Sequence, residues 1–555
     1  MAAASSAAGA STSHRRTSHT LHATTKAPAT GLGRELAGTA SLDDVWMPSS
    51  VPWKPADAEP VKRHSLLSPH DAAVVELKRA SELAALRRRF NALCHENGVA
   101  APPMNAFERW RFQSKWEEEE EAVQGDPLLP VAAEGPPAPS DHARCADERP
   151  RSADESMRAD LRRAGMAPAA SAAVVQAVRS ASARAATRVD NFRSTAAEGG
   201  RLRVRLKREE DGATRLEVPS SFALPPSGEE GGEGGGGRGG DASEDEAPAR
   251  LLDGIRITAP YLHKLRELHA RHGAPRRGAG GGSGGEEGGA GAAADAKRAE
   301  RSFRLRLLAL LLRYHSIGGL GFQAALGGAA FSALQRCLGV NFECFASPLN
   351  CYYGAYCSAF PDVDAPFGSR GSFRGFAPRR GSYEVNPPFV DGLIARMAER
   401  LLSLLAAAHA ACEPLTFVVV LPGWLDSEGY RALDGSSHLR AKLLVAAADH
   451  GFVDGGQHAR TRTFRESPYD TVLFFLQSGA AAAVDEACVE SVRTALARCT
   501  PAAESLASLD PRERVRGRSR KRPRWRKKPP GRPAASSSGS AAVATRGAKR
   551  PREAV

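Results

Sequence analysis

The chain has 555 residues, of which 54 are Gly and 37 are Pro, and its formal net charge at neutral pH is +13. This length allows two or three domains, but the clustered Gly and Pro residues indicate that much of the chain does not fold. The sequence has no run of about eighteen apolar residues, which excludes a membrane-spanning helix and predicts a soluble protein.

The nine cysteines are irregularly spaced and include no CxxC pair. This pattern predicts free thiols in a reducing compartment. Paired ligands at the spacing of a zinc site are also missing, so we expect no bound metal.

The first 149 residues give little indication of function. Residues 1–45 are rich in Ser, Thr and Ala, have no acid before Glu35 and lack an apolar signal core. We interpret them as a disordered leader, with an organelle transit peptide as the alternative. Residues 46–149 include a helix-forming stretch over 71–98, so we expect a partly helical region of unknown role.

Residues 150–335 are predicted to form a mainly helical domain with two glycine-rich insertions, at 228–248 and 273–296, which cannot bury apolar surface. Between the insertions we expect a helix that starts at Pro260. The segment "RLRVRLKREEDG" alternates Leu and Val with basic residues, which predicts a short strand.

From residue 336 to residue 500 short apolar segments alternate with helical patterns. The expected strands are "VNFECFAS", "SYEV", "LTFVVVLPGW" and "DTVLFFLQ", and the expected helices are "FVDGLIARMAERLLSLLAAAHAA" and "SSHLRAKLLVAAADHG". This alternation predicts an α/β domain with a parallel sheet. Ligands of such sheets bind beyond the carboxyl ends of the strands.

Residues 501–555 form a basic tail. Residues 511–555 alone contain sixteen Lys and Arg against two Glu, so the tail carries the positive charge of the chain. Its densest part, "RSRKRPRWRKKPPGRP", predicts a disordered arm for import into the nucleus or for nucleic acid, with a solubilising tail as the alternative.

The turn Asn386-Pro387-Pro388-Phe389 follows "SYEV" and precedes an amphipathic helix. The prolines make it stiff, and in the simplest interpretation it only starts the helix. It also suits a planar group with an exocyclic NH2, such as adenine. The Asn386 side-chain oxygen and the Pro387 carbonyl can accept from the amine while Phe389 stacks on the ring.

A longer match suggests a family. "ALQRCLGVNFECFASPLNCYYGAYCSAFPDVDAPFGSRGSF" and "SYEVNPPF" resemble the phosphorylated-CTD-interacting factors, which are cap-specific adenosine N6-methyltransferases. The resemblance is clear over 314–477 and fainter over 250–315. It implies a Rossmann-like domain packed on a helical domain, S-adenosylmethionine (SAM) as cofactor, and capped mRNA that begins with 2′-O-methyladenosine. Asn386, Pro387 and Phe389 would then grip the adenine, and Pro388 would shape the turn.

The resemblance also implies where SAM binds. The usual GxG motif is absent, and the implied cofactor residues are Glu343, Phe345, Ala346, Ser347, Pro348, Asn350, Asp362, Asp364, Phe367 and Gly368. Without the resemblance, "ECFASPLN" reads as a buried strand and turn, and the two aspartates read as turn formers.

Five residues are candidates for binding the capped RNA. Trp424 lies just after an apolar strand and could stack on a cationic methylguanine, although it could also simply cover the end of the sheet. The arginines before the catalytic turn could bind phosphates, or could form a solvated basic loop. They are Arg370, Arg374, Arg379 and Arg380.

Animal relatives carry a WW domain with two widely spaced tryptophans. Here Trp46 and Trp53, and likewise Trp110 and Trp116, are too close together. The sequence therefore does not favour binding to the C-terminal domain of RNA polymerase II. Two other hypotheses remain: methylation of another amine, in internal RNA, DNA or a protein glutamine, and a non-catalytic RNA-binding scaffold.

Overall fold

The computed structural model describes most of the chain between Trp46 and Cys499. The described residues are 46, 53–58, 66–120, 125–131, 152–195, 202–219, 222, 251–252, 255–273, 289–318, 323–459 and 464–499. They all belong to one compact unit, Met1–Ala502. The leader 1–45, the insertion 228–248 and the tail 501–555 lie outside the described residues.

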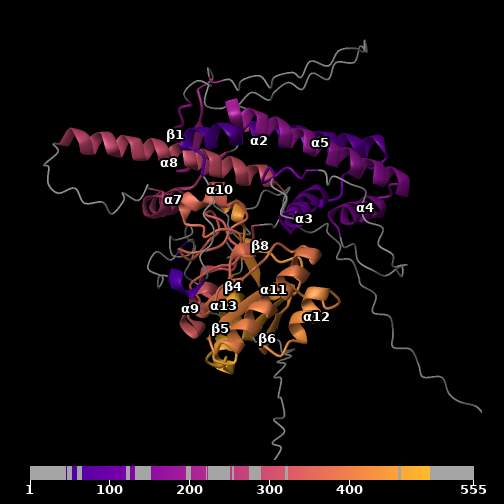
Figure 1. Cartoon of the computed structure of the whole chain (residues 1–555), viewed down its shortest axis with the longest axis vertical. Helices are drawn as coiled ribbons and strands as arrows, with labels where there is room; N and C mark the ends of the chain where they lie inside the picture. The colour runs from indigo at the N-terminus through magenta and orange to yellow at the C-terminus, as the bar shows by residue number, and fades with distance from the viewer. Residues whose placement is uncertain are drawn as a thin grey trace, which may run out of the picture. The chain divides into compact units, whose positions relative to one another are not determined.

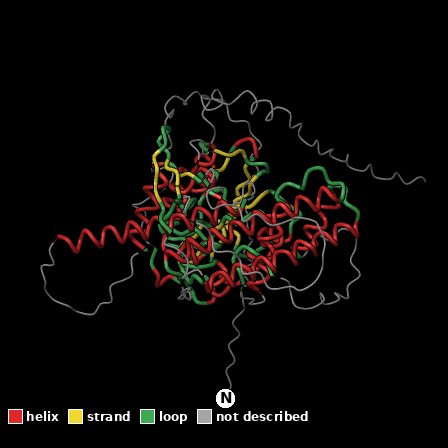
Figure 2. Tube along the Cα trace, turned by 90° about the horizontal axis from the view of Figure 1, so that it is seen from above, coloured by secondary structure: helices red, strands yellow, loops and turns green. Residues whose placement is uncertain are grey.

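The part of the chain before residue 340 is mainly helical (Figures 1 and 2). Its helices are α2 (Pro69–Glu96), α3 (Ala106–Glu120), α4 (Ala153–Arg163), α5 (Pro168–Thr195), α7 (Ala259–His272), α8 (Gly289–Ile317) and α9 (Gly328–Leu338). Strands β1 (Arg205–Arg208), β2 (Thr214–Glu217) and β3 (Arg256–Ile257) form a small antiparallel sheet. The strand expected in "RLRVRLKREEDG" and the helix expected from Pro260 are confirmed as β1 and α7.

One expectation for this region is wrong. We expected a flexible glycine-rich insertion over 273–296, but α8 begins at Gly289, inside that range. The run "GAGAAADAK" is rich in Ala, the best helix former, and it continues a helix whose later turns are anchored in the core.

Helices α2, α5 and α8 pack together around an apolar core that also contains charged side chains. Arg313 of α8 is completely buried, and its guanidinium donates to both carboxylate oxygens of Glu76 on α2 at 2.6 and 2.9 Å. A buried ion pair needs such close hydrogen bonding, because removal of either partner leaves an uncompensated charge. The pair therefore fixes α8 against α2.

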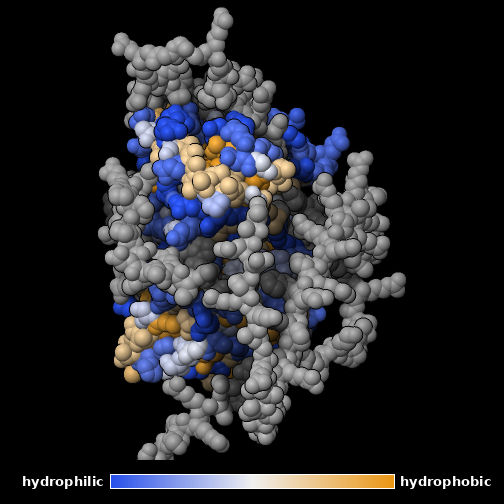
Figure 3. Space-filling view, turned by 90° about the vertical axis from the view of Figure 1, so that its right-hand side faces the viewer, coloured by the Kyte–Doolittle hydropathy of each residue, from blue (hydrophilic) through white to orange (hydrophobic). Residues whose placement is uncertain are grey.

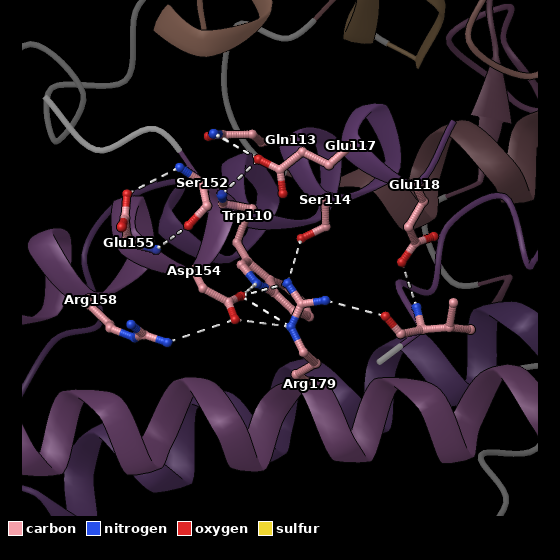
Figure 4. Close-up of polar contacts among 12 residues, drawn as sticks. Trp110, Gln113, Ser114, Glu117, Glu118, Ser152, Asp154, Glu155, Arg158 and Arg179 are labelled. Carbon is pink, nitrogen blue, oxygen red and sulfur yellow. Dashed lines mark hydrogen bonds and ion pairs between the residues drawn. The ribbon is translucent and has the colours of Figure 1, made fainter. Parts of the chain in front are cut away.

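Helices α3, α4 and α5 meet around the guanidinium of Arg179 (Figure 4). It donates to Asp154 at 2.7 Å and to the carbonyl oxygen of Val131 at 3.2 Å. The indole of Trp110 donates to the same Asp154 carboxylate at 2.8 Å. Ser152 and Glu155 form a capping box at the start of α4. Helices α3, α4 and α5 thus share a polar junction as well as a core.

The remaining part is α/β. Its main elements are β4 (Gly381–Val385), α11 (Asp391–Ala410), β5 (Leu415–Pro422), α12 (Glu428–Asp434), β6 (Leu439–Val445), β9 (Thr471–Gln477) and α13 (Glu486–Ala497). Within the described residues these strands form a four-stranded sheet in the order β4-β5-β9-β6. We expected a parallel sheet, but β9 is antiparallel to both β5 and β6. The α/β class is confirmed, and the purely parallel sheet is wrong.

The helix expected over "SSHLRAKLLVAAADHG" is also wrong, because this segment contains β6. Its apolar residues fit either a short helix or a strand. Pairing with the buried strand β9 decides the outcome, and it buries Leu443 and Val445 against α13.

The sheet lies between two helical layers. The layer on one face is α11 and α12, and that on the other face is α9 and α13. Toward α11 and α12 the sheet buries Tyr383, Val385, Phe417, Leu421, Phe474 and Leu476, and toward α9 and α13 it buries Val418, Val420, Leu443, Leu473 and Phe475.

Three short segments extend the sheet beyond β4. Glu343 forms a parallel bridge with Glu384 of β4 and another with Tyr356, and Tyr356 forms one with Ser369. The expected strand "VNFECFAS" is therefore present as a single bridged residue with flanking backbone hydrogen bonds. The spatial order is Ser369, Tyr356, Glu343, β4, β5, β9, β6.

The surface mixes hydrophilic and hydrophobic side chains, as the coloured part of the face in Figure 3 shows. Within the described residues, no helix is long and apolar enough to cross a membrane. Among them, the large hydrophobic residues that are exposed include Leu425 and Tyr469.

Candidate active site

The candidate site lies where the order of the parallel segments reverses. The segment at Glu343 comes first in the chain, and its neighbours are the second segment, at Tyr356, and the fourth, β4. Ligands of open α/β sheets bind at such a reversal, outside the carboxyl ends of the strands. The loop Phe345–Asn350 follows the segment at Glu343, and the loop Asn386–Phe389 follows β4. Both loops therefore leave the carboxyl ends of neighbouring parallel segments. The topology thus brings two of the predicted site segments to one place.

The turn after β4 is held by its own backbone and by a distant segment. The amide of Val390 donates to the Pro388 carbonyl at 2.7 Å, and α11 begins directly afterwards. The side-chain Nδ2 of Asn386 donates to the carbonyl oxygen of Ala324 at 3.2 Å. Because the NH2 group faces Ala324, the Oδ1 of the same amide is the acceptor that a ligand can use.

Aromatic residues surround Phe389. Its half-buried ring meets those of Trp424 and Phe452 edge-on, with centroids 6.4 and 6.2 Å apart. Trp424 in turn meets Tyr469, whose centroid lies 5.3 Å away, and Tyr469 is 44% exposed. The structure therefore places Trp424 beside Phe389 of the Asn386–Phe389 turn. Tyr469 was missed by the sequence analysis, although "SPYD" just before an apolar strand could have indicated it.

The predicted cofactor residues Ser347, Pro348 and Asn350 lie in a turn, Ser347–Cys351, which is closed by its own side chains and is called the cofactor turn below. Asn350 Oδ1 accepts from the Ser347 amide at 2.7 Å and from the Ser347 hydroxyl at 2.9 Å. The amide of Cys351 donates to the Ser347 carbonyl at 2.8 Å, which makes one helical turn. Phe345, before the turn, is half-buried against Phe373 at 4.7 Å, and the Ala346 amide donates to the Cys357 carbonyl. Pro348 is buried.

The carboxylate of Glu343 binds the backbone just after this turn. It is 2% exposed, and its Oε1 accepts from the amides of Tyr352 and Tyr353, each at 2.8 Å. Burial raises the pKa of Glu343 to about 7, although the two amides oppose the shift. The adjacent Glu384 is equally buried, and desolvation together with the nearby Glu343 carboxylate raises its pKa strongly. Glu343 thus holds the loop that follows the turn.

The two aspartates lie on α10 (Pro361–Asp364) and face α8. Asp362 accepts from Arg313 at 2.7 and 3.0 Å, and although desolvation opposes ionisation, this guanidinium lowers the pKa of Asp362 to about 2. Asp364 is fully buried and accepts from the Tyr314 hydroxyl at 2.7 Å. Burial raises the pKa of Asp364 to about 7. Both carboxyl groups thus accept hydrogen bonds from side chains of α8.

Phe367 and Gly368 pack against α7. The ring of Phe367 is fully buried, 5.6 Å from that of His269. Gly368 has a φ of 110°, and a Cβ on it would lie 3.0 Å from the His272 ring, so this position requires Gly. The structure does not bring these two residues to the Asn386 turn.

The four arginines separate into two groups. Arg370 lies over the ring of Trp53 at 5.5 Å, and Arg374 lies over that of Trp116 at 5.8 Å. Arg379 and Arg380 are exposed and precede β4, whereas Asn386 follows it. The five residues of β4 separate its two ends by about 13 Å. Arg379 and Arg380 therefore lie at the amino edge, away from the catalytic turn.

A segment that the sequence analysis missed links the two loops. Asn350 Nδ2 donates to the Gln323 carbonyl at 3.1 Å, and Asn386 donates to the next carbonyl, that of Ala324. Ala325 then pairs with Val453 through two backbone hydrogen bonds of 2.8 Å. Gln323–Ala325 therefore crosses from the turn Ser347–Cys351 to the turn Asn386–Phe389. Its sequence carries no signal for this, because backbone carbonyls make the contacts.

The chain is similar to known proteins over this region. The family model described as "Phosphorylated CTD interacting factor 1 WW domain" matches residues 290–455, a range that contains both loops. The chain is 36% identical over 227 residues to a human protein, and 38% identical over 187 residues to a mouse protein. Both relatives are named mRNA (2'-O-methyladenosine-N(6)-)-methyltransferase.

Over residues 290–455 the chain is thus similar to the phosphorylated-CTD-interacting factors. The alignments cover 39% and 32% of this chain but only 30% and 26% of the two relatives, so it spans about a third of their length or less. The description of the family model mentions a WW domain, but the matched range contains Trp424 as its single tryptophan. Within the described residues, no group of three or more His, Cys, Asp or Glu is arranged to hold a metal ion.

Proposed function

We propose that this protein transfers a methyl group from SAM to N6 of the adenosine next to the cap of mRNA, where that adenosine carries a 2′-O-methyl group. The observation that carries the proposal is the position of Asn386, at the carboxyl end of β4 with its NH2 group turned to Ala324 and its Oδ1 left as an acceptor. The names of the human and mouse relatives support this substrate.

The strand order supports a Rossmann-like methyltransferase domain. Numbered along the chain, the segments at Glu343, Tyr356 and Ser369, with β4 and β5, lie in the order 3-2-1-4-5. This is the order of the Rossmann sheet, with its ligand site between segments 1 and 4. The antiparallel β9 is inserted between β5 and β6.

The chemistry of the site suits a ligand with N–H donors. Gln323 Oε1 and Glu384 Oε1 are buried, and within the described residues neither has a hydrogen-bond donor. Both residues adjoin the two loops, and an unpaired buried acceptor is costly. SAM carries an ammonium group and an adenine amine that can donate, and when bound it supplies an electrophilic methyl group. The residues that would hold it are those of the Phe345–Asn350 loop together with Glu384.

The chain itself would orient the acceptor amine. An adenine amine is a poor nucleophile because its lone pair is delocalised into the ring. Asn386 Oδ1 and the Pro387 carbonyl, as acceptors for its two hydrogens, favour a pyramidal nitrogen whose lone pair points away from them. Phe389, with its ring fixed edge-on by Trp424 and Phe452, would stack on the base.

The decisive experiment is mass spectrometry of cap nucleotides after incubation of the full chain with SAM and a capped transcript that starts with A. We expect one added methyl on the adenine. A capped transcript that starts with G, an uncapped transcript, duplex DNA and a glutamine peptide serve as comparisons. Equal transfer to uncapped RNA would refute cap specificity, and RNA binding without SAM binding would support the scaffold hypothesis.

We also propose that the protein acts in the nucleus, directed there by the basic residues 511–555. A fluorescent fusion should lose its nuclear accumulation when these residues are deleted. The phosphorylated C-terminal domain of RNA polymerase II is the second partner to test, because the description of the matching family model names it. A pull-down with phosphorylated and unphosphorylated peptides distinguishes specific binding from attraction to the basic tail.

A further inference from the structure

Lys264 of α7 is a fully buried lysine whose ammonium reaches the cofactor turn. Its side chain is 0% exposed, and Nζ donates to the carbonyl oxygens of Leu349 at 3.1 Å and Cys351 at 2.6 Å. Burial lowers its pKa, and the nearby Cys351 and Glu343 oppose this shift. Burial of an ammonium is unfavourable unless hydrogen bonds compensate it, so the two carbonyls are what keep Lys264 in place.

These carbonyls lie at the end of the helical turn Ser347–Cys351. A cationic side chain at the carboxyl end of a helical turn satisfies carbonyls that have no partner within the turn. The opposite side of the same loop is fixed by Glu343, which accepts from the amides of Tyr352 and Tyr353. Lys264 therefore holds the turn through its carbonyls, and Glu343 holds the two residues that follow the turn through their amides.

The turn is also connected to the catalytic asparagine. Between Leu349 and Cys351 lies Asn350, which donates to Gln323, and the carbonyl of the following Ala324 accepts from Asn386. The connection from Lys264 to Asn386 thus consists of three hydrogen-bonded steps: Lys264 to the carbonyls on either side of Asn350, Asn350 to Gln323, and Asn386 to Ala324. A displacement of the turn moves the carbonyl that orients Asn386.

We propose that Lys264 is a positioning residue, which sets the cofactor turn and, through Asn350 and Ala324, the amide of Asn386. This inference rests on the proposed function for its kinetic consequences, but its structural consequence does not depend on that function. A residue outside the sheet domain would then control both methyl-donor affinity and turnover.

The test uses Lys264→Met in the full chain, since Met has similar length but no donors. Lys297→Met, on an exposed lysine of α8, makes the same chemical change at the surface as a control. Hydrogen exchange measures the effect on the loop without any ligand. We expect faster exchange at the amides of Cys351, Tyr352 and Tyr353 in Lys264→Met alone, and unchanged exchange there would overturn the proposal.

Calorimetry and steady-state kinetics measure the functional effect at a temperature at which circular dichroism shows every variant folded. Lys264→Met should weaken SAM binding and lower kcat, each by about tenfold to a hundredfold. A purely structural lysine would lower thermal stability and leave both within twofold. If the wild type neither binds SAM nor transfers methyl, the proposed function fails, and the exchange data still decide the positioning role.

Asn350→Asp provides a second variant in case Lys264→Met does not fold. Asp keeps the acceptor for Ser347 but loses the donor to Gln323, so kcat should fall as well. In a double-mutant cycle, the loss in the double variant should be smaller than the product of the single losses, because both act through one connection. Independent, multiplicative losses would contradict the proposed path to Asn386.

Discussion

The side-chain amide of Asn386 donates to the backbone carbonyl of Ala324, 62 residues earlier in the chain. This contact fixes which end of the amide is offered to a ligand, and it involves a segment that lies across the carboxyl edge of the sheet. The turn Asn386–Phe389 is therefore not a self-contained motif. Its chemistry depends on a connection between α8 and α9 that the motif itself does not reveal.

Asn386→Ala should abolish methyl transfer while the fold persists. In the proposed reaction the change removes an acceptor for the adenine amine, and loss of one such polar group lowers kcat by about a hundredfold to a thousandfold. Quenched-flow measurement with capped RNA and saturating SAM gives the rate. Asn191→Ala, on the exposed side of α5, is the control and should keep wild-type activity. Activity of Asn386→Ala within tenfold of wild type would contradict the role.

Trp424→Leu should weaken RNA binding more than SAM binding. Leu keeps apolar volume against the sheet but removes the flat ring that meets Phe389 and Tyr469. A lost stack on a base corresponds to about 1–3 kcal/mol, so KM for capped RNA should rise by about tenfold. Leu425→Ala, at the exposed neighbour, is the control. An unchanged KM would show that Trp424 only covers the end of the sheet.

Sequence patterns identified the parts of this molecule that depend on local chemistry. The turn Asn386–Phe389, the turn Ser347–Asn350 and helix α7 could be predicted because prolines, capping residues and apolar spacing act over a few residues. The direction of β9 and the strand β6 could not, because pairing with a distant strand decided them. The same holds for Asp362 and Asp364, whose partners, Arg313 and Tyr314, lie on a helix about fifty residues earlier.

The pH dependence of stability should reveal the buried Asp364. Its folded pKa, about 7, exceeds the ordinary value of 3.8, so the folded state binds the extra proton. Its contribution to stability is fully present below about pH 4 and is lost as pH rises toward 7. Asp364→Asn should therefore unfold at a higher temperature than the wild type at pH 8, with little difference at pH 4. Calorimetric scans at both pH values measure this.

Asp362→Asn provides the opposite case. The pKa of Asp362 lies near 2, below its ordinary value, so its contribution is present at neutral pH and is lost as pH falls toward 2. Asp362→Asn should lower the unfolding temperature at pH 7, because Arg313 loses a charged partner. If both variants raised the unfolding temperature at neutral pH, or both lowered it, the opposite pKa shifts of Asp362 and Asp364 would be contradicted.

Trp53 should prove necessary for the sheet domain, although the sequence assigned residues 46–149 no role. Its indole donates to the Tyr383 hydroxyl at 3.3 Å, and its ring packs on Phe342 at 4.9 Å, next to the segment that precedes the cofactor turn. Backbone contacts anchor the same stretch, because Arg379 donates to the Asp57 carbonyl at 2.8 Å. Residues 53–58 thus form a strap over the amino edge of β4.

Trp53→Ala should lower the free energy of unfolding by about 1–3 kcal/mol, less than for a fully buried tryptophan because the ring is only half-buried. Urea denaturation, followed by circular dichroism, measures this. Leu66→Ala removes an exposed side chain just after the strap and should change stability by less than about 0.5 kcal/mol. Equal stability of Trp53→Ala and wild type would mean that the strap does not support the sheet. A loss confined to Trp53→Ala would instead show that the sheet domain depends on residues outside the range 290–455 matched by the family model.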